Sequence, residues 1–254
     1  MGKIKNNNQI PAPPLCSAPN QKQIDACIRC GTCCTMGGPG FHHADRALIE
    51  KGAIHSRYLY TLRKGELAYD NVRGCLTPVD DDVIKLKGRN DSWSCIFYDE
   101  DQKSCEIYDT RPLQCKVLQC WDTQQLEDIY DKNRLTRQDL VSDIKGLWEL
   151  ICNHQIRCDY DKIRKLVNTL NSSAKESVQK ELIEIIQYDT EIRKLVVSDG
   201  GLETGMLDFL FGRPLLRTIS NYGLRVDSNQ KKIRLVPARG QRTHKHCDDE
   251  SGSG

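Results

Sequence analysis

Apolar residues recur three and four positions apart through most of the second half of the chain, with charged residues between them. This spacing predicts amphipathic helices over residues 123–133, 137–154, 160–171 and 175–197. The longest of them carries Leu182, Ile185 and Ile186 on one apolar stripe, which we interpret as core packing. Residues 224–236 form two apolar-rich stretches around a polar turn, and this pattern predicts a β-hairpin.

The first half of the chain is patterned in shorter stretches. Loose alternation over residues 65–88 predicts strands, and residues 93–108 predict a hairpin that carries one cysteine on each arm. Short helices are expected at 21–28, 42–52 and 111–122. Between the first two of these helices, glycines at 31, 37, 38 and 40 predict an irregular, tightly turning backbone.

These elements together predict an α+β fold, in which a small irregular cysteine-cluster domain with short strands precedes a mainly helical region and a terminal β-hairpin. The expected divisions are a flexible arm at 1–19, the cysteine domain at 20–122, the helical region with its hairpin at 123–237, and a flexible tail at 238–254. The tail ends in SGSG, a sequence typical of an artificial linker.

Composition changes this picture mainly through cysteine. The chain has 13 cysteines, and nine of them lie between Cys27 and Cys120. The N-terminal residues lack the apolar core of a secretory signal, and no stretch approaches the ~20 apolar residues of a membrane span. We therefore expect a cytoplasmic protein, where clustered cysteines more often bind metal than form disulfides. A net charge of +2 gives no electrostatic indication of nucleic-acid binding.

The strongest motif is C-x2-C-x2-C-C. Thiolates at this spacing, on a backbone that glycines allow to turn, can converge on one soft metal ion or on an iron–sulfur cluster. The run cannot complete a site alone, because adjacent cysteines project in different directions. Four later cysteines are the expected completion. The eight candidate ligands are Cys27, Cys30, Cys33, Cys34, Cys95, Cys105, Cys115 and Cys120.

Eight thiols could hold one or two 4Fe–4S clusters, since each cluster takes four cysteines. They could equally hold one cluster with spare thiols, or zinc. Three evenly spaced cysteines favour iron–sulfur ligation, whereas a structural zinc site usually combines two separated pairs.

The sequences CIRCGTCC and WSCIFYDEDQKSCEIYDTRPLQCKVLQC resemble the YkgJ-type cysteine cluster proteins. These proteins are described as having a zinc- or iron-chelating CxxCxxCC domain and are often labelled iron–sulfur oxidoreductases. The resemblance covers about residues 27–122, and residues 207–226 are also similar to the end of longer members. It implies metal ligation, most directly by the cysteines at 27, 30, 33, 34, 105 and 115; Cys95 and Cys120 fit a longer version of the pattern. It implies no particular reaction.

Other candidates have ordinary structural interpretations. We expect Cys75 to be a buried free thiol. Cys152 and Cys158 flank His154 at a spacing that matches no common zinc pattern, so a second metal site is the less favoured alternative there. His42 and His43 follow the cysteine run and could be ligands, but helix capping or surface exposure explains them more simply.

Three functions therefore remain open from the sequence. The first is an iron–sulfur protein that relays electrons or assists a redox enzyme, with a redox or client protein as its partner. The second is a structural or metal-delivery protein that uses zinc or iron. The third is a protein-modifying enzyme in which the cluster is structural. No catalytic triad, HExxH motif or paired carboxylates indicate an independent active site.

Overall fold

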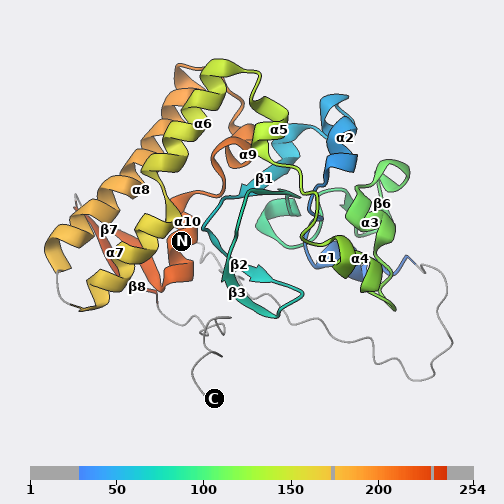
Figure 1. Ribbon diagram of the computed structural model, residues 1–254, viewed down its shortest axis with the longest axis horizontal. Coiled ribbons are helices and arrows are strands. Elements are labelled where there is room, and N and C mark those ends of the chain that lie inside the picture. The colour runs from blue at the N-terminus through green and yellow to red at the C-terminus, as the bar shows by residue number, and fades with distance from the viewer. Residues whose placement is uncertain (1–28, 173–174, 230–231, 239–254) are drawn as a thin grey trace, which may run out of the picture.

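The computed structural model describes residues 29–172, 175–229 and 232–238 (Figure 1). Its first half contains short helices and strands: α1 (Thr32–Thr35), α2 (Arg46–Glu50), β1 (Leu59–Leu62), β2 (Leu67–Asp70), β3 (Cys75–Pro78), β4 (Val83–Leu86), β5 (Tyr98–Asp99), β6 (Ser104–Cys105) and α3 (Leu113–Val117). The second half contains α4 (Gln124–Ile129), α5 (Arg137–Val141), α6 (Lys145–Arg157), α7 (Tyr160–Ser172), α8 (Lys175–Ser198), α9 (Leu207–Phe211), α10 (Leu215–Thr218), β7 (Leu224–Asn229) and β8 (Lys232–Pro237). The α+β prediction is confirmed.

A small antiparallel sheet lies at the centre of the molecule. Strands β1 and β4 pair directly, with Leu59 opposite Leu86. On the free side of β4, the extended residues 39–43 add backbone hydrogen bonds, including Phe41 N–H to Ile84 O at 2.9 Å. Residues 133–135 pair in turn with this segment, as Leu135 N–H donates to Phe41 O at 3.0 Å. Four segments from distant parts of the sequence therefore share one sheet.

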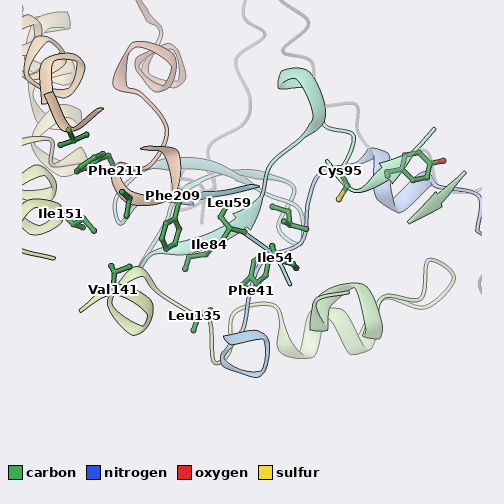
Figure 2. Close-up of a cluster of buried hydrophobic side chains, with 14 residues drawn as sticks. Phe41, Ile54, Leu59, Ile84, Cys95, Leu135, Val141, Ile151, Phe209 and Phe211 are labelled. Atoms are coloured by element: carbon green, nitrogen blue, oxygen red, sulfur yellow. The ribbon is translucent and has the colours of Figure 1, made fainter. Parts of the chain in front are cut away.

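One face of this sheet is apolar and buried, as strand alternation requires. Phe41, Leu59, Ile84 and Leu135 are each fully buried on it. Side chains from α6, α8 and α9 cover this face, and Figure 2 shows Phe209 beside Leu59 and Ile84, with Phe211 on the side of Ile151. Burial of one large apolar side chain contributes roughly 2–3 kcal/mol. The sheet thus depends on the C-terminal half for its core.

A second core lies among the helices. Residues of α7 and α8 pack against α10 and the β7–β8 hairpin, and Leu182, Ile185 and Ile186 are all buried there. The predicted apolar stripe and the predicted terminal hairpin are both confirmed, with Leu224 paired to Pro237. The predicted helix over 137–154 was wrong in one respect, because it is divided into α5 and α6 at residues 142–144. No described helix combines the length and the apolar character needed to cross a membrane.

Buried ion pairs connect the sheet to the helices. Arg137 donates from Nε and Nη2 to the two carboxylate oxygens of Asp82, at 2.6 and 3.0 Å, and from Nη1 to the backbone oxygen of Leu210. Bidentate pairs of this kind are strong and fix relative orientation. Since Asp82 directly precedes β4 and Arg137 begins α5, the pair fixes how α5 and α9 lie against the sheet.

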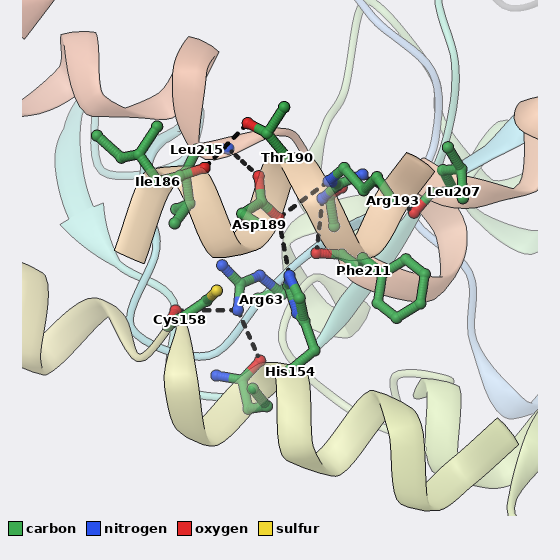
Figure 3. Close-up of polar contacts among 12 residues, drawn as sticks. Arg63, His154, Cys158, Ile186, Asp189, Thr190, Arg193, Leu207, Phe211 and Leu215 are labelled. Carbon is green, nitrogen blue, oxygen red and sulfur yellow. Dashed lines mark hydrogen bonds and ion pairs between the residues drawn. The ribbon is translucent and has the colours of Figure 1, made fainter. Parts of the chain in front are cut away.

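A second polar network lies between α6 and α8 (Figure 3). Asp189 on α8 accepts hydrogen bonds from His154 Nε2 at 2.8 Å, Arg193 Nε at 2.9 Å and the backbone N–H of Leu215 at 2.9 Å. Arg193 also donates to the backbone oxygens of Phe211 and Gly212. Burial lowers the pKa of His154 to about 4, in opposition to its hydrogen bond with Asp189, so the imidazole is neutral at pH 7.

The buried neutral His154 makes a testable contribution to acid stability. Its folded-state pKa of about 4 lies below the ordinary 6.5 of the unfolded chain. Between these values the unfolded chain binds more protons, so stability is lost as the pH falls from 6.5 toward 4. This contribution is at most about 3 kcal/mol. We expect the free energy of unfolding in urea to fall less steeply over this range for His154→Gln than for the wild type.

The exposed His43 supplies the control, because its side chain is 52% exposed. His43→Gln should keep the wild-type pH dependence. If His154→Gln and the wild type lose equal free energy between pH 6.5 and 4.5, His154 is not the group responsible.

Candidate metal centre

The described cysteines of the motif lie on one side of the molecule, where α1, β6 and α3 come together (Figure 1). Cys30, Cys33 and Cys34 lie in or beside α1, Cys105 lies in β6 and Cys115 lies in α3. Cys95 is in the loop before β5. Cys27, the first predicted ligand, lies outside the described residues. The free thiols among the described candidate ligands include Cys30, Cys33, Cys34, Cys95, Cys105 and Cys115.

The helix α1 is a single turn that the glycine pattern did not predict. Glycines had indicated irregular backbone here, yet Thr32–Thr35 is helical and starts after Gly31, whose φ of 78° is in the left-handed region. A Cβ atom on Gly31 would collide with the ring of Tyr98, which is buried. The one glycine therefore permits both the turn and the close approach of β5, and this fixes where Cys33 and Cys34 lie.

Backbone hydrogen bonds bring the second set of cysteines to the first. Cys95 N–H donates to the backbone oxygen of Cys34 at 2.7 Å. The predicted hairpin forms, but the prediction that each of its arms carries a cysteine was wrong for Cys95. Cys105 is paired with Tyr98, whereas Cys95 forms an isolated bridge with Gly88. The strands are only two residues long, so the loop before them, and not a longer β5, positions Cys95.

Side chains of the 39–45 segment hold α3 in place. Gln114 accepts a hydrogen bond from Gly40 N–H at 2.6 Å, and Asp45 accepts one from Leu113 N–H at 2.8 Å. His42 is 2% exposed, and its two ring nitrogens contact the backbone oxygen of Lys132 at 2.8 Å and the side chain of Gln114 at 3.1 Å. Both nitrogens are therefore occupied, and His42 supports the helix that carries Cys115.

The thiols also perturb one another electrostatically. A hydrogen bond from Cys34 lowers the pKa of Cys33 to about 6, and the same contact raises the pKa of Cys34. Burial raises the pKa of Cys115 to about 12, and the neighbouring Cys95, Cys33 and Cys105 raise it further. Burial likewise raises the pKa of Cys95 and of Cys105. Thiols that repel each other's negative charge in this way need a cation to be ionised together.

The separation of two of these sulfur atoms suits a shared metal ion. Cys33 Sγ and Cys34 Sγ are 4.0 Å apart. Thiolates around a single tetrahedral zinc would be ~3.8 Å apart, since each Zn–S bond is ~2.3 Å. Within the described ranges, no three cysteine sulfur atoms lie within 4.8 Å of one another. Cys33 and Cys34 are thus close enough to bind one metal ion, zinc or iron.

Buried donors without partners lie next to these sulfur atoms. Arg111 Nε, Arg89 Nε and Ser94 Oγ are buried and form no hydrogen bond. The guanidinium of Arg111 lowers the pKa of Cys33 and of Cys105. Arg89 acts in the same direction on Cys95, and Ser94 is its neighbour in the chain. Buried polar groups are normally satisfied, so these donors fit a polyanionic group held by the cysteines.

The remaining described cysteines lie in different settings. Cys120 is exposed after the end of α3. Cys75 is disulfide-bonded, so the prediction of a free thiol there was wrong. Cys158 is buried with its sulfur near His154 and Asp189, and ligand atoms of these three residues lie within 4.8 Å of one another. Cys152 is not part of this group.

Charge argues against metal binding at the group of His154, Cys158 and Asp189. Arg193 already donates to the carboxylate oxygen that His154 uses, and Arg63 Nη1 donates to the backbone oxygen of Cys158 at 3.1 Å. Two buried guanidinium groups next to the site would repel a further cation strongly. We interpret the group as part of the structural network of Figure 3.

Gly31 provides a test of how the centre is built. Gly31→Ala should reduce the metal bound per chain by displacing α1 from Tyr98. Gly52→Ala is a matched control, because Gly52 has a φ of 75° and its added Cβ would contact nothing within 4 Å. Both variants carry the cost of alanine at a positive φ, which is about 1 kcal/mol or more. Elemental analysis of purified protein should show a deficit in Gly31→Ala alone; an equal deficit in both variants would contradict this assignment.

Comparison with known proteins agrees with the location of the centre. Residues 26–136 match the CxxCxxCC family, which is described as "Putative zinc- or iron-chelating domain". No curated protein and no solved structure matches the chain significantly. The matched range includes every cysteine of the centre and ends just after residues 133–135, which form the last segment of the central sheet. Residues 26–136 are thus similar to the CxxCxxCC domains, which carry the description "Putative zinc- or iron-chelating domain".

Proposed function

We propose that this domain holds an iron–sulfur cluster, as one or two 4Fe–4S centres, and that the protein relays electrons or assists a redox enzyme. The gathering of cysteines from separate segments is the observation that carries the proposal. Cys95 N–H donates to the backbone oxygen of Cys34, and Cys33, Cys95 and Cys105 all influence the pKa of Cys115. In a 4Fe–4S cluster each cysteine binds a different iron atom, so the ligands can come from several segments of a chain.

The polar surroundings support the same proposal. An iron–sulfur cluster carries negative charge on its thiolates and sulfides, and hydrogen bonds to these sulfurs tune its reduction potential. Arg111 Nε, Arg89 Nε and Ser94 Oγ are available donors on the described side of the centre. Arg111 also stacks on Tyr108, 3.8 Å from the ring centroid, which holds its guanidinium in place.

Exposure of the ligands is consistent with exchange of electrons with a partner protein. Cys30 and Cys33 are exposed, whereas Cys95 is buried. A cofactor held between them would have one edge near the surface and the other inside the protein. The exposed edge would allow contact with a redox partner, while the buried edge would be protected from water.

Analysis of anaerobically purified protein tests the proposal. We expect a brown protein with iron and acid-labile sulfide in comparable amounts, and a paramagnetic signal after reduction. Cys115→Ala should lose most of this iron. Cys152→Ala is the matched control, because Cys152 is also a half-buried free cysteine but lies in α6, away from the centre. A colourless protein that contains stoichiometric zinc would refute the proposal and leave the structural zinc function.

The Arg111 donor gives a second prediction. Loss of its positive charge should disfavour the reduced, more negative state of the cluster, so the midpoint potential of Arg111→Gln should be lower than that of the wild type. Removal of a charge-assisted hydrogen bond costs about 1.5–3 kcal/mol, which corresponds to roughly 60 mV or more for a one-electron couple. Redox titration followed by electron paramagnetic resonance measures this shift.

Lys116→Gln controls for the loss of a positive charge, because Lys116 is an exposed residue of α3. It should change the potential little, since exposed charges are screened by solvent. Equal potentials in Arg111→Gln and the wild type, at equal iron content, would show that Arg111 does not donate to the cluster.

A further inference from the structure

The face of the central sheet that is opposite the apolar core carries a polar pair of residues beside the apolar pair Leu62 and Val83. Tyr60 in β1 and Lys85 in β4 are directly paired across the strands. Their neighbours Leu59, Ile84 and Leu86 are buried on the core face, so Tyr60 and Lys85 lie on the other one. Both are half-buried. Lys85 is also bridged to Gly40, which places it in the middle of the sheet.

Lys85 has no partner of its own. Its ammonium group forms no hydrogen bond and no ion pair with any residue of the described ranges. Lysines in partly buried positions are normally paired or extend their charge into solvent. Here burial, followed by the nearby guanidinium groups of Arg134 and Arg213, lowers the pKa of Lys85 to about 8. Both the burial and the neighbouring positive charges therefore disfavour the charged form of Lys85.

The carboxylate of Glu66, which pairs with Arg213, is already engaged. Glu66 is fully buried, and its Oε1 accepts hydrogen bonds from Arg213 Nε at 2.7 Å and Nη2 at 2.6 Å. Its Oε2 accepts from the backbone N–H of Arg63 at 3.0 Å. Arg134 donates from Nε to the backbone oxygen of Tyr130. This acceptor is uncharged, so it does not neutralise the positive charge of Arg134. Arg213 therefore occupies this carboxylate of Glu66, and among the described residues neither Lys85 nor Arg134 forms an ion pair with a carboxylate.

Tyr60 adds a neutral donor to this face. Burial raises the pKa of Tyr60 to about 12, so its hydroxyl keeps its proton at neutral pH. Lys85 supplies three N–H donors and the fork of Arg134 supplies others. Donors and cations gathered without an acceptor are the features that recognise an anion with several oxygen atoms.

We propose that Lys85, Arg134 and Tyr60 form a binding site for a small oxyanion, a phosphate or a carboxylate, on the outer face of the central sheet. Lys85 is the central contact, and Arg134 and Tyr60 supply further donors. Arg213 contributes positive charge from the position that Glu66 fixes. The site lies next to α3, since Cys115 is among the groups that influence Lys85. A ligand that carries such an anion would bind beside the metal centre, but the proposal does not depend on which metal that centre holds.

Thermal unfolding in phosphate tests this site. Inorganic phosphate should raise the melting temperature of the wild type in a saturable way, beyond the effect of potassium chloride at equal ionic strength. Lys85→Met should abolish that rise, and in phosphate-free buffer it should unfold at a higher temperature than the wild type, because it removes an unpaired, desolvated charge. Lys64→Met is the control: Lys64 is exposed just after β1, and its replacement should change neither result.

Calorimetric titration with phosphate and, separately, with acetate distinguishes the two sources of oxyanion. Lys85→Met should weaken binding of the preferred anion by about tenfold or more, which is the usual effect of losing one charge-assisted hydrogen bond. Arg134→Gln should weaken it less. Failure of both anions to bind the wild type, equal binding by Lys85→Met, or stabilisation that chloride reproduces would each overturn the proposal. None of these outcomes bears on the iron–sulfur assignment.

Discussion

The pairing of residues 39–43 with two other segments determines the architecture around the metal centre. Through Phe41, this segment donates a hydrogen bond to β4 on one side and accepts one from Leu135 on the other. The same stretch joins α1 to the apolar core. The backbone N–H of its Gly40 and the carboxylate of Asp45, two residues beyond it, hold the helix that carries Cys115. A displacement of this one strand would move cysteines from both ends of the motif, so the rigidity of the centre derives from the sheet.

Much of the architecture could be predicted from the sequence because regular periodicity marks long elements. The helices α7 and α8 and the terminal hairpin have clear apolar spacing, and all three are confirmed. The central sheet could not be predicted in the same way. Residues 39–43 and 133–135 are short and join by backbone hydrogen bonds across about ninety residues of sequence, and side-chain patterns do not record such pairings. The two-residue strands that carry Tyr98 and Cys105 were also too short for a pattern to give the register.

The candidate cysteine ligands could be predicted from the sequence, but the hydrogen-bond donors around them could not. Cysteine spacing identified the metal domain, and the family match agrees. Arg111 was noticeable in the sequence because it precedes a proline, whereas Arg89 and Ser94 carried no signal at all. Their importance lies in being buried without partners, which depends on the packed structure. The same applies to Lys85, whose place in an alternating strand indicates only which face it occupies.

The burial of the core face beneath Phe209 and Phe211 has a consequence for how the protein is made. All the candidate ligand cysteines have left the ribosome once residue 120 has emerged, yet the side chains that cover the sheet are synthesised much later. Until then, Phe41, Leu59 and Ile84 have no cover in the nascent chain, and the cysteines have no rigid support. Stable cofactor insertion would therefore be a late event that follows the folding of the helical half, and a chain truncated after the family domain would present an apolar surface to other proteins.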